Sequence, residues 1–71
     1  MLPRYTYLVK FFHRDPEELN ETVEHITEES ARSHFASFDE SDADIYKRVV
    51  LTKMDWTTLD EEVLQTLELP A

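Results

Sequence analysis

The chain has 71 residues, of which 16 are acidic and 7 basic, giving a formal net charge of -9 at pH 7, and it contains neither glycine nor cysteine. A chain of this length makes one domain, so residues 1–71 are expected to fold as a single unit of modest stability. The lack of cysteine excludes disulfides and thiol nucleophiles, and the lack of glycine excludes the phosphate-binding loops of nucleotide enzymes.

Residues 5–12 are predicted to form a strand, because aromatic and β-branched side chains are dense there and pack well on a pleated surface. The next segment, Asp15-Pro16, fits either a hairpin turn or the start of a helix. Residues 20–26 include poor helix formers, which favours a short strand paired with the first one. The competing interpretation is a helix that kinks and continues as a second helix.

Thr27 is predicted to begin a helix, since it is an N-cap residue type that precedes two acids and follows the hydrophobic Ile26. The helix is expected over residues 28–38, with Ile26 packed against Ala31 as a hydrophobic staple. Residues 39–44 are then the loop that leads to the next strand.

Residues 45–56 are the second strand that the composition predicts firmly. In residues 61–69, alternating apolar side chains permit a closing strand, whereas Val63, Leu64 and Leu67 after a run of acids also permit a terminal helix. The expected fold class is therefore α+β, a small antiparallel sheet with one helix packed on it. The preferred order is ββαββ, and βαβα is the alternative.

Aromatic side chains on the predicted strands suggest a second use of the sheet. Tyr5, Tyr7 and Tyr46 are expected on the face away from the helix, and an uncovered aromatic face would favour homodimer formation. Trp56 is expected at the edge of the core or, because tryptophan is enriched in interface anchors, in contact with a partner.

Acids and bases are segregated along the chain. Except for Arg32, every base lies in or beside the two firmly predicted strands, whereas residues 15–31 contain no base but seven carboxylates: Asp15, Glu17, Glu18, Glu21, Glu24, Glu28 and Glu29. The loop adds Asp39, Glu40, Asp42 and Asp44. Such charge can serve solubility alone, or it can imitate the phosphates of a nucleic acid and enter the basic channel of a protein that binds one.

No catalytic, metal or cofactor site is predicted. His25 and His34 have the spacing of no standard zinc motif, and His13 stands alone. Ser33 and His34 are neighbours on the predicted helix, where adjacent side chains point apart, so they do not form a nucleophile and base pair. The chain is therefore expected not to be an enzyme.

The run ITEESARSHFASFDESD (26–42) followed by IYKRVVLTKMDW (45–56) resembles small acidic proteins of uncharacterised function that bacteriophages and other mobile elements encode. The resemblance points to no specific family and assigns no functional residue. It implies the host-takeover or anti-defence type, which includes anti-CRISPR proteins, anti-restriction DNA mimics, uracil-DNA glycosylase inhibitors and RNA polymerase modulators.

The expected function is that of a small acidic binding protein, a phage-encoded inhibitor that occupies a basic nucleic-acid-binding surface of a host protein. It would not bind nucleic acid or a membrane directly, would need no cofactor, and would act in the host cytoplasm. The expected contact residues are the loop carboxylates Asp39, Glu40, Asp42 and Asp44, a second patch, and Trp56. The second patch comprises Glu17, Glu18, Glu21, Glu24, Glu28 and Glu29. The alternative is a homodimeric accessory module whose acidity serves only solubility.

Overall fold

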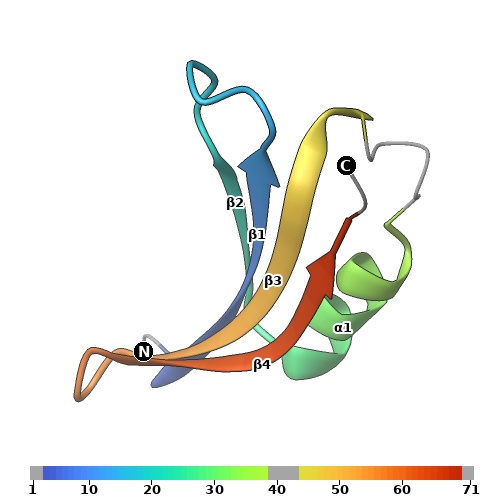
Figure 1. The fold of residues 1–71 in the computed structure, drawn as a ribbon. Helices are drawn as coiled ribbons and strands as arrows, with labels where there is room; N and C mark the ends of the chain where they lie inside the picture. Colours follow the sequence, from blue (N-terminus) through green and yellow to red (C-terminus); the bar gives the residue numbers. More distant parts are fainter. Residues whose placement is uncertain (1–2, 39–43, 70–71) are drawn as a thin grey trace.

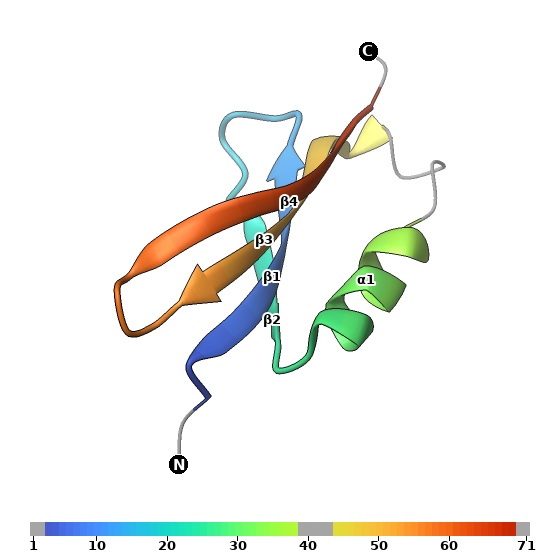
Figure 2. The same cartoon turned by 90° about the horizontal axis from the view of Figure 1, so that it is seen from below.

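The computed structural model describes residues 3–38 and 44–69. In this part of the chain the elements follow one another as β1 (Tyr5–His13), β2 (Glu21–His25), α1 (Glu28–Ala36), β3 (Tyr46–Asp55) and β4 (Asp60–Glu68). The strands form one antiparallel sheet in the order β2-β1-β3-β4, and α1 lies against one face of it (Figure 1, Figure 2). The predicted α+β class, with one helix on an antiparallel sheet, is confirmed, and both segments left open between strand and helix are strands.

The helix begins where the sequence predicts and ends two residues early. The Thr27 side chain accepts a hydrogen bond of 3.2 Å from the Ser30 amide, which satisfies one of the donors that a helix start leaves unpaired. The last helical residue is Ala36, after which the Ser37 amide closes the final turn on the carbonyls of the preceding residues. Ile26, predicted to pack on the helix as a staple, is 72% exposed and does not extend the core.

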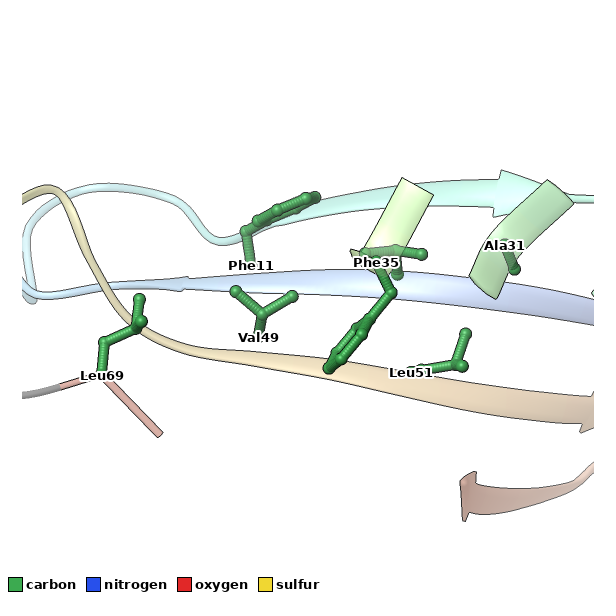
Figure 3. Packing of buried hydrophobic residues seen from close by; sticks show 7 residues of the cluster. Phe11, Ala31, Phe35, Val49, Leu51 and Leu69 are labelled. Carbon is green, nitrogen blue, oxygen red and sulfur yellow. The ribbon is translucent and has the colours of Figure 1, made fainter. Parts of the chain in front are cut away.

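The core is a single apolar layer between α1 and the two central strands. Strand pairing sets Val9 opposite Leu51 and Phe11 opposite Val49, so these four side chains form one patch on the helix side of the sheet. Ala31 and Phe35 of α1 lie over the patch, and Leu69 closes it after the end of β4 (Figure 3). Burial of apolar side chains therefore stabilises the central strands β1 and β3 more than the edge strands.

A β-bulge explains why the last segment resembled a helix in its sequence pattern. Leu51 pairs with Gln65 but Thr52 pairs with Val63, so Leu64 is an extra residue on β4. Both Leu64 and Leu67 pack against the core, although strict alternation would place residues three apart on opposite faces. The bulge thus allows a strand to carry apolar spacing that is typical of a helix.

The prediction that the tyrosines lie on the sheet face away from the helix is wrong. Tyr7 and Tyr46 pack against the core cluster on the helix side, where the Tyr46 ring lies 5.3 Å from that of Phe11. Tyr5 falls on the same side by alternation, with the Lys53 ammonium 4.3 Å from the centre of its ring. The β1 sequence has tyrosine and phenylalanine in phase with the buried Val9, so the face that carries the tyrosines is the face that α1 covers.

The turn between β3 and β4 contains a backbone conformation that leucine rarely adopts. Leu59 has a φ of 63°, the only positive φ among the described residues. The Asp55 side chain accepts hydrogen bonds from the amides of Thr57 and Thr58, and the Asp55 carbonyl accepts one of 2.7 Å from the Leu59 amide. These bonds hold Leu59 in the left-handed region, where its Cβ clashes with the following carbonyl.

The contribution of the buried core to stability can be tested by the same substitution, leucine to alanine, at a buried and at an exposed position. Leu51→Ala should lower the free energy of unfolding by about 2–5 kcal/mol, because it removes a fully buried side chain and leaves a cavity. Leu19→Ala, at a leucine that is 87% exposed, should change it by less than about 0.5 kcal/mol. Urea denaturation followed by circular dichroism measures both values, and equal losses would contradict the described core.

Strain at Leu59 gives a second stability prediction. Leu59→Gly should raise the free energy of unfolding by about 0.5 kcal/mol, since relief of the left-handed conformation outweighs the added freedom of the unfolded chain. Leu19→Gly, in a loop without a positive φ, should lower it by a similar amount. If both variants are destabilised, the turn does not hold the leucine under strain.

Candidate partner-binding surface

Six exposed carboxylates lie on β2 and on its two flanks, and together we call them the acidic edge. They come from the β1–β2 turn, from the edge strand β2 and from the first turn of α1: Glu17, Glu18, Glu21, Glu24, Glu28 and Glu29. On β2 itself, Glu21 faces the helix side of the sheet and Glu24 faces the opposite side. The turn is held by Asp15, whose side chain accepts from the Glu17 amide and whose carbonyl accepts from the Glu18 amide. The second patch predicted from the sequence is therefore brought together along β2 and its two flanks.

Internal ion pairs neutralise a different part of the protein. Bases on or beside β1 and β3 pair with carboxylates of β3 and β4 in three contacts: Arg4 with Asp55 at 3.2 Å, Lys10 with Glu61 at 2.6 Å and Arg48 with Glu68 at 2.7 Å. Within the described residues, the acidic edge has one ion pair, between Glu28 and Arg32 at 2.8 Å. The negative charge of the edge thus remains largely uncompensated.

Two of the paired carboxylates are also held in their ionised form. A hydrogen bond from Arg4 lowers the pKa of Asp55, and hydrogen bonds from Lys10 and Thr52 lower the pKa of Glu61. The Thr52 hydroxyl is almost fully buried and donates to Glu61 at 2.9 Å, so this carboxylate satisfies a polar group of the sheet. Asp55 and Glu61 therefore serve the fold, whereas the acidic edge faces solvent.

An apolar hollow adjoins the acidic edge where β1 begins and β3 ends. Pro3, Thr6, Glu24, Ile26 and Trp56 line it, and its volume is about 640 Å³. The Trp56 indole N–H donates to the Thr6 hydroxyl at 2.8 Å, and that hydroxyl donates to Glu24 Oε2 at 3.0 Å. This chain of hydrogen bonds fixes the indole in place while 48% of the Trp56 surface stays exposed. We call this site the Trp56 hollow.

The positions of the predicted contact residues differ. Asp39, Glu40 and Asp42 lie outside the described residues, and Asp44 is exposed just before β3. Trp56 has a satisfied N–H, as expected for a residue at the core edge, and an exposed ring surface, as expected for a partner contact. Sequence reasoning missed Pro3, Thr6 and Ile26 as parts of one site, since only strand pairing brings them to Trp56.

Two histidines link β2 to α1. The His25 Nδ1 atom lies 2.9 Å from the Ser30 hydroxyl, and its Nε2 atom lies 2.9 Å from His34 Nδ1. These contacts, together called the histidine row, join the strand to the helix. The His34 ring also contacts the Phe11 ring at a tilt of 50°, with 5.6 Å between the ring centres. Burial, followed by repulsion from His25, lowers the pKa of His34. Across residues 3–38 and 44–69, no three or more metal-ligating side chains are grouped as a metal site would require.

Comparison with family models, curated proteins and solved structures finds no match. None of the helices in the described part of the chain has the length and apolar character needed to cross a membrane. The functional argument therefore depends on the charge and shape of the surface.

The histidine row predicts that stability depends on pH. The pKa of His34 is lowered in the folded protein, so this imidazole binds a proton more readily in the unfolded chain. The contribution of His34 to the free energy of unfolding is therefore present above its ordinary pKa of 6.5 and is lost as the pH falls below that value. The wild type should lose stability between about pH 8 and pH 5.5, and His34→Gln should flatten this slope. Urea denaturation across this range measures the slope.

Asp55 and Glu61 change their contribution to stability at lower pH than His34, so they do not affect this test. The lowered pKa values of Asp55 and Glu61 stabilise the fold above their ordinary values of 3.8 and 4.5, and this stabilisation is lost as the pH falls through the folded values. A slope near neutrality that His34→Gln leaves unchanged would show that the histidine row does not couple protonation to folding.

Proposed function

We propose that this protein is a small, acidic, non-enzymatic binding protein that occupies a basic nucleic-acid-binding surface of a host protein, in the manner of a phage-encoded inhibitor. The observation that carries the proposal is the separation of charge. Three of the bases on and beside β1 and β3 (Arg4, Lys10 and Arg48) are paired with carboxylates of β3 and β4. Among the described residues, the acidic edge has only the ion pair between Glu28 and Arg32.

The spacing of the edge supports a collective field. Glu17 and Glu18 are adjacent in the sequence, as are Glu28 and Glu29, so the Cα atoms within each pair are about 3.8 Å apart. The Debye length at physiological ionic strength is about 8 Å, so the fields of neighbouring exposed carboxylates overlap. Overlapping negative charges attract a basic groove, accelerate association and repel nucleic acid from the same surface.

The scaffold supports the same proposal. Glu21 and Glu24 lie on a strand paired with β1, and Glu28 and Glu29 lie on a capped helix, so much of the edge is held by regular structure. The side chains of Glu21 and Glu24 also accept hydrogen bonds from Tyr46 and Thr6. A preorganised charge pattern loses less conformational freedom on binding than a flexible acidic tail does.

The alternative of a homodimer that forms through an exposed face of tyrosines is not favoured by the structure. Tyr7 and Tyr46 belong to the core region under α1 and are not available as an open aromatic face. The acidity of the second copy would also oppose any contact made through the acidic edge.

Affinity capture from a bacterial lysate tests the proposal. The immobilised protein should retain nucleic-acid-binding proteins that duplex DNA displaces, because both ligands would compete for one basic surface. Capture by Glu17→Gln combined with Glu29→Gln should fail at a lower salt concentration than capture by the wild type. The control, Asp60→Asn combined with Glu62→Gln, removes the same charge from exposed positions of β4 and should elute with the wild type.

Two results would contradict the proposed function. One is capture that duplex DNA does not displace, which would place the contact away from a nucleic-acid-binding surface. The other is an equal effect of both double variants, which would show that total charge matters and the acidic edge does not.

A further inference from the structure

The acidic edge explains attraction to a basic partner, but it does not explain the Trp56 hollow. The hollow brings together two exposed apolar side chains, Trp56 with 48% and Ile26 with 72% of the surface exposed, so they form one apolar patch beside a carboxylate. We infer that the Trp56 hollow binds the side chain of an arginine of the partner protein. This inference rests on the proposed function, because the basic partner supplies the arginine.

The walls of the hollow fit the two parts of an arginine side chain. Pro3 and Ile26 offer apolar surface to its methylene stem, and Trp56 offers an aromatic surface to its guanidinium group. The indole cannot turn freely, because its N–H is bonded to Thr6. The aromatic surface is therefore in position before the partner arrives.

Glu24 supplies the charge that selects a cation. Its Oε2 atom accepts from Thr6 at 3.0 Å, and this is the one hydrogen bond that its carboxylate makes within residues 3–38 and 44–69. A guanidinium group can donate two parallel N–H bonds to a carboxylate, which adds directional specificity to charge attraction. The Glu24 carboxylate retains the acceptor capacity that this contact needs.

The nearest base of the chain does not fill the hollow. Arg4 follows Pro3 in the sequence, but its guanidinium contacts both carboxylate oxygens of Asp55, at 3.3 and 3.2 Å, and lies 5.0 Å from the centre of the Tyr5 ring. Tyr5 and Asp55 pair on the helix side of the sheet, whereas Thr6 and Glu24 are on the other side. No lysine or arginine is among the described residues that line the hollow, so the proposed cation comes from another molecule.

Other occupants fit less well. A purely apolar side chain would bury Glu24 without a partner for its charge, and a phosphate would be repelled by Glu24 and by the acidic edge. A second copy of the chain would bring two acidic edges toward each other. Lysine can pair with Glu24, but it lacks the planar group that stacks on an indole and donates two parallel bonds.

Two short peptides of equal charge test the inference with the full chain. In one, arginines alternate with alanines, and in the other lysines replace the arginines; both are acetylated and amidated. The arginine peptide should bind about fivefold more tightly by isothermal titration calorimetry, because of stacking and paired donation. It should also change the fluorescence of Trp56, which is the one tryptophan of the chain, more than the lysine peptide does.

Variants of two carboxylates locate the effect. Glu24→Gln keeps an acceptor for Thr6 but removes the charge and the paired acceptor oxygens, so it should reduce the preference for arginine to the part that comes from stacking on Trp56. Glu18→Gln removes the same charge from a part of the acidic edge that does not line the hollow, so it should weaken both peptides equally and keep the preference. Circular dichroism of both variants confirms that the fold is intact.

The outcomes separate this inference from the proposed function. Equal, salt-sensitive binding of both peptides with unchanged Trp56 fluorescence would overturn the arginine site and leave the acidic edge as the binding surface. Lack of binding by either peptide would overturn it too, while displacement of captured proteins by duplex DNA would still support the proposed function. A molecular mass that doubles with concentration, together with a change in Trp56 fluorescence without peptide, would assign the hollow to a second copy and overturn the inference.

Discussion

The contact between one short helix and two central strands governs the rest of this structure. Val9, Leu51 and Val49 are fully buried between α1 and the sheet, and no second helix covers the opposite face in the described part of the chain. A core of this width can bury β1 and β3 but leaves β2 and β4 at the edges. Charged residues that cannot be buried are consequently found on the edge strands, the turns and the outer surface of the helix.

Carboxylates have two roles in this protein: some form ion pairs on the sheet, and others remain exposed to solvent. The positions of the lysines and arginines decide which role a carboxylate has. Lysines and arginines on β1 and β3 reach the carboxylates of β3 and β4, so Glu61 and Glu68 become part of the sheet surface. Among the described residues, β2 carries no lysine or arginine, and the one ion pair of the acidic edge lies on the helix. Both edge strands are acidic, but β4 has two carboxylates paired with bases, whereas the carboxylates of β2 form no ion pair with another described residue.

The elements could be predicted where local preference and burial agree, as in the two central strands and the Thr27 cap. Residues 61–69 could not be decided, since the bulge at Leu64 obeys no simple period. The acidic edge was visible in the sequence because its carboxylates are close along the chain. The Trp56 hollow was not, because residues about fifty positions apart meet only when β1 pairs with β3.

The edge strands also determine how copies of this protein behave toward one another. A sheet with two unpaired edges can grow strand by strand into fibres when another chain adds to it. Here β4 begins with three consecutive acids and contains a bulge, and β2 is short and flanked by carboxylates. Like charges therefore face each other whenever two edges approach, which opposes the edge-to-edge pairing of copies.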